Sequence, residues 1–213
     1  MSISGKNLLK TLKEIAGISG PNLVLRVNGF PAFWLRPIAT RSQNINYQDI
    51  ALLTAWRNMY PKSFLTEFIA TESQTFSWLT DRVHFDNKII FMIENCESPV
   101  GYMGISFIDW NKSYLEPDSI VSGGIHPKGL MTAALLTLLQ WSKGQLGLNN
   151  VGIRVLSDNP ALTFYNRLGF VETKRVPLIL KDKQSHYEWV EDAAYINADR
   201  YLVYHYWSGV PSK

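Results

Sequence analysis

The stretch Ser157–Glu172, with the sequence SDNPALTFYNRLGFVE, contains both the start and the end of one short helix. Asn159 is a good N-cap, and Pro160 suits the first helical position, where a missing N–H costs nothing. Gly169 supplies the left-handed residue that commonly ends a helix. Tyr165 lies in the apolar stripe between them, although a buried phenol needs a hydrogen-bond partner. Two interpretations of Tyr165 therefore stand: a core residue, or a hydroxyl that faces a reacting group.

A second segment, upstream of this helix, also combines a strand, a loop and a helix. Residues 119–125 are expected to form a strand, the loop 126–129 follows, and apolar residues at helical spacing continue to about Gly144. The first N–H groups of a helix have no internal partner and lie at the positive end of its dipole. Gly129 allows a ligand close to the backbone and Lys128 adds charge, so the segment indicates a phosphate or pyrophosphate site. Taken alone, such a turn more often binds nothing.

The composition is that of a folded globular protein. Of 213 residues, 46% are hydrophobic and 18% are charged, which excludes a disordered chain. The net charge of +3 comes without a run of Lys or Arg, so nucleic-acid binding has little support. Cys96 is the single cysteine and the histidines are scattered, so we expect no disulfide and no metal site. No stretch is apolar enough to span a membrane, and the N-terminus is too polar for a signal peptide. A cytoplasmic protein is expected.

The rest of the chain alternates helices and strands without a repeat or a linker. The pattern therefore predicts one domain, 1–213, with 1–30 as an N-terminal extension, and a mixed α/β (α+β) sheet with helices on its faces. Helices are expected at 8–15, 46–60 and 71–83, and further strands at 22–27, 33–38, 88–95, 99–110, 151–157, 176–181, 185–191 and 200–207.

The two segments together resemble the acetyl-CoA-binding core of the GNAT superfamily of N-acetyltransferases, over residues 119–170. In that family a strand leads into an R/Q-x-x-G-x-G/A loop and a long helix, and a second strand leads into N-x-A-x-x-x-Y and then G-F. The second element is matched here by N-P-A-L-T-F-Y from Asn159 to Tyr165 and by the Gly-Phe pair that follows. In the first element only Gly129 is kept, because His126 and Met131 replace the usual residues.

The resemblance implies a GNAT-like, mostly antiparallel twisted sheet flanked by helices and splayed between its fourth and fifth core strands. It implies acetyl-CoA as co-substrate, no metal, and Tyr165 as the general acid that protonates the CoA sulfur. Asn159 would contact the CoA arm or only cap its helix. The residues implied in cofactor binding are Ile125, Lys128, Gly129, Leu130, Met131, Thr132, Ala133 and Asn159.

Shorter motifs resemble one GNAT branch, which acetylates amino sugars carried on nucleotides. They are FWLRPI, the Trp-Arg-Asn triplet at 56–58, TESQTFSWL and PVGYMGISFID. The resemblance implies that Arg57 contacts a phosphate of the acceptor, that Ser106 lies along the acceptor groove and that Trp78 packs against the sugar. The alternatives are a surface ion pair for Arg57 and core packing for Trp78. The general base stays open among Glu116, Asp118, Asp109, His84, His126 and a water chain.

Other functions fit the same sequence. The acceptor could instead be a peptide or protein N-terminal amine, or a small polyamine, which the mild basicity does not favour. The altered loop at His126 and Met131 argues for a non-catalytic acyl-CoA-binding module. The aromatic tail 200–207 suggests a protein-interaction domain, and pairing of that tail at a strand edge would give a homodimer.

Overall fold

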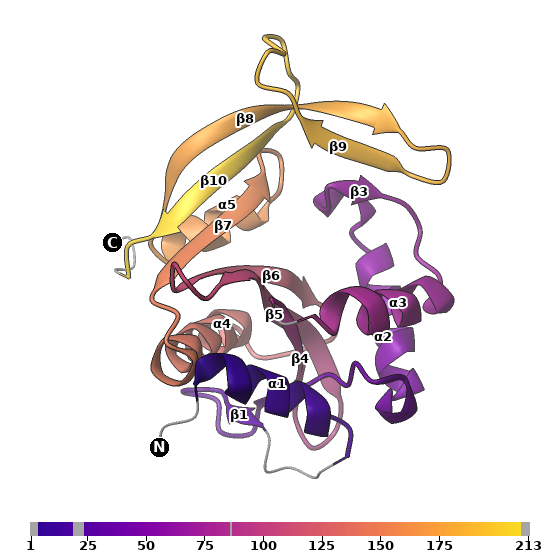
Figure 1. The fold of residues 1–213 in the computed structure, drawn as a ribbon, viewed down its shortest axis with the longest axis vertical. Coiled ribbons are helices and arrows are strands. Elements are labelled where there is room, and N and C mark those ends of the chain that lie inside the picture. Colours follow the sequence, from indigo (N-terminus) through magenta and orange to yellow (C-terminus); the bar gives the residue numbers. More distant parts are fainter. Residues whose placement is uncertain (1–3, 19–23, 86, 210–213) are drawn as a thin grey trace. The chain divides into compact units, whose positions relative to one another are not determined.

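A computed structural model describes residues 4–18, 24–85 and 87–209 of the chain. The residues group into two compact units. Unit 1 consists of Met1–Trp56 and Thr71–Asn150, and unit 2 of Arg57–Ala70 and Val151–Lys213. Each unit is built around its own run of antiparallel strands with helices beside them (Figure 1). Mixed α/β structure with mostly antiparallel strands is therefore confirmed. The single domain and the splay between core strands stay predictions.

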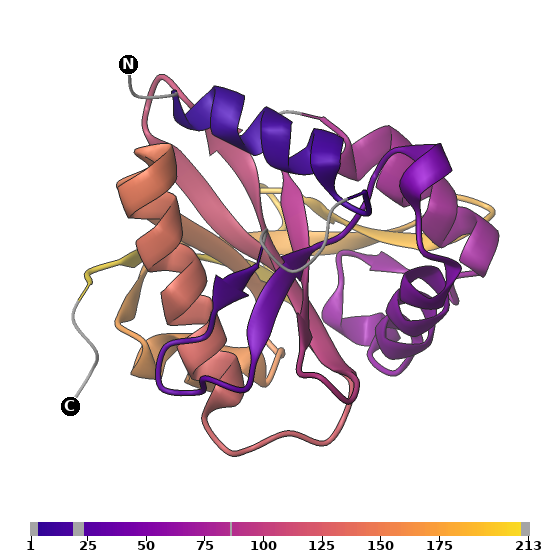
Figure 2. The same ribbon diagram turned by 90° about the horizontal axis from the view of Figure 1, so that it is seen from below.

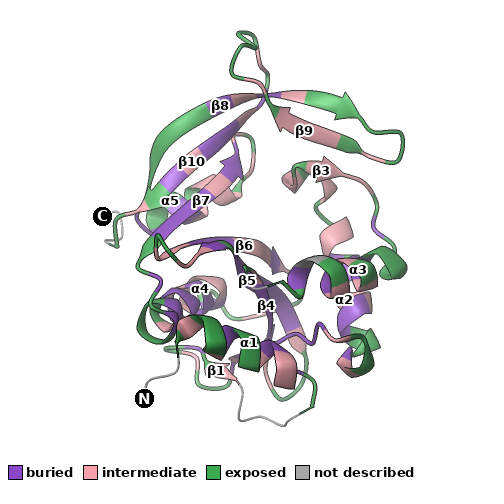
Figure 3. Cartoon of the chain, in the orientation of Figure 1, coloured by how far each residue is buried: buried purple, intermediate pink, exposed green. Residues whose placement is uncertain are grey.

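The strands of unit 1 follow the order β1-β2-β4-β5-β6, and each is antiparallel to its neighbour. They are β1 (Leu25–Arg26), β2 (Trp34–Pro37), β4 (Ile89–Glu94), β5 (Pro99–Asp109) and β6 (Tyr114–Ser122). The predicted hairpin of β4 and β5 is confirmed. These two strands carry a near-continuous buried run, because they occupy the middle of the order (Figure 3).

The predicted helices of unit 1 are present, although the first begins at Gly5, three residues before the predicted start at residue 8. They are α1 (Gly5–Ile15), α2 (Tyr47–Asn58), α3 (Glu72–Trp78) and α4 (Leu130–Trp141), and α3 and α4 each continue into a π-helical turn, at Leu79–Val83 and Ser142–Leu146. Asn46 accepts the amide of Gln48 before α2, and Thr71 forms a capping box before α3. The start of α1 lies beside the end of the α4 segment, where Gly5 fits against the backbone of Leu146 (Figure 2).

The N-terminal helix α1 packs against the rest of unit 1. Leu9 is buried, and the ammonium of Lys13 donates to the carbonyl oxygens of Val83 and Phe85. Among the described residues, no helix is both long and apolar enough to cross a membrane.

The strands of unit 2 follow the order β7-β10-β8-β9-β3, again with antiparallel neighbours. Their bounds are β3 (Thr66–Glu67), β7 (Asn150–Leu156), β8 (Phe170–Asp182), β9 (Tyr187–Glu191) and β10 (Tyr201–Trp207), and the unit contains one α-helix, α5 (Ala161–Arg167). The first part of β8 pairs with β10 and its second part pairs with β9, so β8 joins two hairpin-like pairs. Leu156, Leu178 and Leu202 form a buried cluster there.

The aromatic tail lies inside the sheet of unit 2, which corrects the expectation of a free strand edge. Strand β10 is bonded to β7 on one side and to β8 on the other, from Leu202 to Tyr206. It therefore offers no free strand edge for pairing into a homodimer. The alternation of RYLVYHYW reflects a strand with one buried face and one more open face, and a protein-interaction role for this tail stays a prediction.

Candidate functional site

The loop after β6 starts earlier than the sequence suggests. The amides of Gly123 and Gly124 both donate to the carbonyl oxygen of Val100, at 2.9 and 2.8 Å, and this shared acceptor ends the regular ladder. The strand therefore stops at Ser122 rather than at Ile125, whose residue surface is 99% exposed. Gly123 also lies against the Trp56 ring, where a Cβ would come within 2.0 Å of a ring atom.

The N-terminus of α4 has the conformation expected of an anion-binding turn. Gly129 has φ of 89°, in the left-handed region, and a Cβ there would meet no atom closer than 3.8 Å. The glycine is thus required by the backbone and not by lack of space. The amide of Leu130 donates to Pro127 O and that of Ala133 to Gly129 O.

The helix entry leaves two main-chain donors for a ligand. Between Leu130 and Ala133, the amides of Met131 and Thr132 have no acceptor among the described residues, as the first turn of a helix predicts. Both residues are partly buried, whereas Lys128 is exposed on the loop before them. This geometry fits a phosphate or pyrophosphate group.

His126 shapes the loop with its own hydrogen bonds. Its Nε2 lies 2.9 Å from Ser122 Oγ, and its Nδ1 lies 3.1 Å from Pro127 O. Because a carbonyl oxygen only accepts, Nδ1 carries a proton, and in the neutral ring Nε2 then accepts from the Ser122 hydroxyl. Both ring nitrogens of His126 are therefore engaged by the loop itself.

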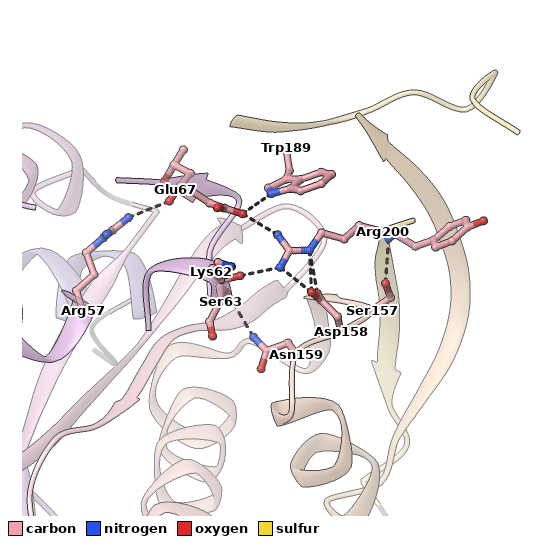
Figure 4. A network of polar contacts seen from close by, with 11 residues as sticks. Arg57, Lys62, Ser63, Glu67, Ser157, Asp158, Asn159, Trp189 and Arg200 are labelled. Atoms are coloured by element: carbon pink, nitrogen blue, oxygen red, sulfur yellow. Dashed lines mark hydrogen bonds and ion pairs between the residues drawn. The ribbon is translucent and has the colours of Figure 1, made fainter. Parts of the chain in front are cut away.

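In unit 2, the start of α5 is capped as the sequence predicts. Asn159 Oδ1 accepts the amide of Ala161 at 2.9 Å, and Asn159 Nδ2 donates to Ser63 O at 3.4 Å (Figure 4). Gly169 ends the helix with φ of 87°. Asn159 thus binds the amide of the first helical residue, whereas Pro160, which was expected at the first helical position, lies just before α5; a contact between Asn159 and CoA stays a prediction.

Tyr165 is buried on α5 with 7% of its surface exposed. Its ring meets those of Phe164 and Phe170 edge to face, with centroids 5.2 and 5.7 Å apart. These contacts fix the ring orientation. The structure therefore supports the core interpretation for the ring and leaves the role of the hydroxyl a prediction.

Arg57 is anchored to the main chain of unit 2. Its Nη1 donates to Phe68 O at 2.8 Å and its Nη2 to Thr66 O at 3.0 Å. The guanidinium also lies over the rings of Phe64 and Phe68, 4.7 and 3.9 Å from their centroids. These contacts hold the segment between α2 and β3.

Trp78 gathers with charged groups of unit 1 around Lys88. The Lys88 ammonium lies 5.0 Å from the centre of the Trp78 ring and donates to Asp118 Oδ2 at 2.6 Å. Asp118 also accepts the amide of Ser119, a residue with φ of 54°. Burial favours a higher pKa for Asp118, but the charge and hydrogen bond of Lys88 and the Ser119 amide outweigh it and lower that pKa.

The third predicted acceptor residue and the candidate bases lie on or near the same strands. Ser106 is buried on β5, opposite Glu116 of β6. Glu116 is buried as well and accepts the Tyr114 hydroxyl at 2.9 Å. Asp109 accepts the amides of Lys112 and Asn111 in the β5–β6 turn, and the Lys112 amide is the main reason why its pKa is lowered. His84 is exposed, with Nδ1 2.9 Å from Thr40 Oγ1.

Sequence reasoning missed two cations, Lys88 in unit 1 and Arg200 in unit 2. Lys88 stands at the first position of an apolar run, where it resembles an ordinary strand start. Arg200 binds residues more than forty positions away, so no local spacing signals it. Among the described residues, no group of His, Cys, Asp or Glu is arranged to hold a metal ion.

Comparisons with known proteins agree with this geometry. Residues 51–170, more than half of the chain, match the model of the acetyltransferase (GNAT) family. A comparison with curated proteins gave no match.

Three solved structures show the same fold at low identity. A probable GNAT-family acetyltransferase from Chromobacterium violaceum has a TM-score of 0.62 at 16% identity, covering 87% of this chain and 92% of its own. Spermidine N-acetyltransferase from Vibrio cholerae, in complex with CoA and spermine, has a TM-score of 0.61 at 18% identity, and the match covers 84% of this chain and 97% of that one. The ribosomal L7/L12 α-N-protein acetyltransferase RimL has a TM-score of 0.63 at 13% identity, and the match covers 86% of this chain and 92% of that one. The described fold and the family match together show that the chain belongs to the GNAT family of acetyltransferases.

Proposed function

We propose that the chain transfers the acetyl group of acetyl-CoA to a primary amine, and that the amine belongs to a nucleotide-linked amino sugar. One observation carries the transferase proposal. Within a GNAT-matched segment, a left-handed glycine opens a helix with two available amides, and a capped helix carrying a buried tyrosine follows. The first feature suits a pyrophosphate and the second suits a positioned proton donor.

Acetyl-CoA fits the residues of the α4 entry. The amides of Met131 and Thr132 would bind its pyrophosphate, and the exposed Lys128 adds a positive charge beside them. Ile125, Leu130 and Ala133 complete this segment of the proposed cofactor site. The replacements at His126 and Met131 leave the site intact, because the binding groups are main-chain donors.

The chemistry is a direct acyl transfer. The neutral amine nitrogen of the acceptor forms a bond to the thioester carbonyl carbon, and the carbon–sulfur bond then breaks. Tyr165 donates its hydroxyl proton to the departing CoA thiolate, and the amine loses a proton to solvent or to a carboxylate. Asn159 would hold the CoA arm near the start of α5. A general acid of this kind contributes about 10²- to 10⁴-fold to the rate.

The acceptor proposal rests on the family resemblance and on the surroundings of Trp78. The aromatic face of Trp78 suits a sugar ring, and Ser106 lies on the neighbouring strand β5. Lys88 and Asp118 carry opposite charges and form an ion pair in this group. Arg57 would need to leave the carbonyl oxygens of Thr66 and Phe68 before it could bind a phosphate.

The test measures thiol release from acetyl-CoA with a panel of nucleotide-linked amino sugars, spermidine and a peptide with a free N-terminus. The last two are the acceptor classes named for two of the similar structures. We expect release with one amino sugar. Release only with spermidine or the peptide would keep the transferase and replace the acceptor. Binding of acetyl-CoA without release with any amine would indicate a non-catalytic module.

Tyr165→Phe tests the acid role within the same assay. Phenylalanine keeps the ring contacts with Phe164 and Phe170, so we expect an approximately 10²-fold lower kcat near neutral pH. Tyr206→Phe is the matched control, because Tyr206 is about half exposed on β10 and belongs to neither proposed site. Equal kcat values for Tyr165→Phe and the native protein would remove Tyr165 from the chemistry.

A further inference from the structure

Arg200 forms a dense set of polar contacts at the start of β10 (Figure 4). Only 7% of its surface is exposed. Its Nε and Nη2 form a fork on the Asp158 carboxylate, with distances of 2.9 Å to Oδ1 and 2.7 Å to Oδ2. Its Nη1 donates to Glu67 Oε1 at 3.0 Å, and its Nη2 also donates to Lys62 O at 3.0 Å.

An aromatic side chain closes the network on one side. The Arg200 guanidinium lies 4.7 Å from the centre of the Trp189 ring. Trp189 Nε1 donates to the same Glu67 oxygen that Arg200 binds, at 2.6 Å. The guanidinium is therefore fixed in its plane and in its direction, since stacking and a forked carboxylate each restrict a planar cation.

The contacts of Arg200 and its neighbour Tyr201 hold the residues that precede α5. Ser157 exchanges hydrogen bonds with Tyr201, the residue after Arg200: its amide donates to Tyr201 O and its hydroxyl accepts from Tyr201 N. Asp158 is held by Arg200, and Asn159 donates to Ser63 O. Ser157, Asp158 and Asn159, the first three residues after β7, are thus each tied to another segment of unit 2.

The arrangement restricts geometry more than it adds stability. Asp158 has 55% of its side chain exposed, so its ion pair is screened by solvent. A buried arginine loses hydration, which offsets much of its attraction to carboxylates. The forked ion pair and the stacking on Trp189 mainly fix the orientation of the Arg200 guanidinium and of Asp158. Asp158 belongs to the turn that precedes α5, the helix that carries Tyr165.

We propose that Arg200 is a positioning residue of the acetyl transfer. It acts through Asp158, Glu67 and Trp189 to fix the turn 157–159, and with it Asn159 and the first turn of α5. The inference rests on the proposed roles of Asn159 and Tyr165, because only those roles give the turn a place in the reaction.

Three variants test it: Arg200→Met removes the cation, Arg200→Lys keeps the charge without the fork, and Asp158→Asn keeps the shape without the charge. Arg175→Met is the matched control. Arg175 also forms a two-bond pair with a carboxylate, Glu172, and lies over an aromatic ring, that of Tyr201, but it is about half exposed on β8.

The first readout is hydrogen exchange of the amides at 161–165, which needs no activity. We expect faster exchange in the three variants and unchanged exchange in Arg175→Met. Unchanged exchange in Arg200→Lys and Asp158→Asn would overturn the positioning role, whatever reaction the protein performs. These two variants keep the test decisive if Arg200→Met fails to fold.

The second readout is the split between kcat and KM for acetyl-CoA, measured well below each variant's melting temperature. We expect kcat/KM to fall by up to about 100-fold in Arg200→Met, with Arg200→Lys intermediate, as a misplacement on the order of 1 Å predicts. Equal constants in native protein and variants, despite faster exchange, would confine Arg200 to a structural role. A native protein without acetyl-CoA turnover would instead refute the proposed function.

Discussion

Two turns each connect a strand to a helix, and they are held in place by different kinds of hydrogen bond. After β6, the turn 123–129 is fixed mainly by main-chain bonds to Val100 O and Pro127 O and by the left-handed Gly129, and the His126 side chain adds bonds to Ser122 Oγ and Pro127 O. After β7, the turn 157–159 is fixed mainly by side chains, above all the fork of Arg200 on Asp158.

Whether a turn is held by main-chain or by side-chain hydrogen bonds determines which substitutions it tolerates. A turn built from main-chain bonds keeps its shape when side chains change, as long as its special φ value is met. A turn built from side-chain bonds depends on the identity of each partner, including partners far along the chain. The left-handed Gly129 and the main-chain bonds of the α4 entry are accordingly present although His126 and Met131 depart from the family pattern.

Substitution of Gly129 should have the largest effect, because it attacks the main chain directly. Gly129→Ala places a Cβ at φ of 89°, which costs about 1–2 kcal/mol for an L-residue. If the turn relieves this strain by moving, the amides of Met131 and Thr132 move too, and acetyl-CoA binding weakens. Chemical unfolding and calorimetric titration with acetyl-CoA measure the two effects.

Gly144→Ala is the control for this experiment. Gly144 lies in the π-helical turn after α4, and a Cβ there meets no atom within 4 Å. We expect unchanged acetyl-CoA affinity and equal or higher stability in this variant. A native-like melting temperature and affinity in Gly129→Ala would show that the backbone of the α4 entry is not strained by a Cβ.

Removal of a helix cap from each unit should have the next largest effect. Asn159→Ala removes the acceptor for the Ala161 amide, and Thr71→Ala removes the acceptor for the Gln74 amide at α3. Each change should lower the free energy of unfolding by about 1 kcal/mol. Only Asn159→Ala should also raise the KM for acetyl-CoA. An equal KM in both variants would leave Asn159 as a cap alone.

The sequence predicted the elements whose causes are local. Thr71 with Gln74, and Asn159 with Gly169, are helix signals whose partners lie within a few residues, and the structure confirms them. The motif around Gly129 was likewise found because a strand, a glycine and a helix follow one another directly.

The remaining features depend on contacts between distant segments. Strand β6 ends at Ser122 because Val100, on another strand, accepts two amides. The tail is central because β7 and β8 lie on either side of it, which no pattern within 200–207 reveals. The contacts of Arg57 and Arg200 are with residues from other elements, so their charge alone suggested surface or ligand roles.

A buried histidine gives unit 2 a pH-dependent stability. His205 lies on β10 opposite Ile153 and Glu172, and its Nδ1 has no partner among the described residues. Burial lowers the pKa of His205, although the Glu172 charge opposes this. The folded state therefore takes up the proton less readily than the unfolded chain, whose imidazole titrates near a pKa of about 6.5.

Stability should consequently fall as the pH drops through about 6.5, because the unfolded state binds the proton first. The loss should stay below about 1 kcal/mol at pH 6. His205→Gln should remove this slope, while His186→Gln, at the partly open β8–β9 turn, should keep it. Melting temperatures between pH 7.5 and 5.5 measure the slopes. If the melting temperature depends on pH equally in the native protein and in His205→Gln, His205 does not cause the pH dependence.

The smallest effect should come from His126, although it stands at a signature position of the family pattern. His126→Ala removes contacts to Ser122 Oγ and Pro127 O but leaves the amides of Met131 and Thr132 and the φ value of Gly129 in place. Because the binding groups are main-chain donors, the Kd for acetyl-CoA should change by less than about twofold. Lys128→Ala is the comparison, since it removes a charge and should weaken binding more, with an effect that shrinks as salt is added. A loss of affinity in His126→Ala that equals the loss in Gly129→Ala would mean that side chains hold this turn too, and the contrast between the two turns would disappear.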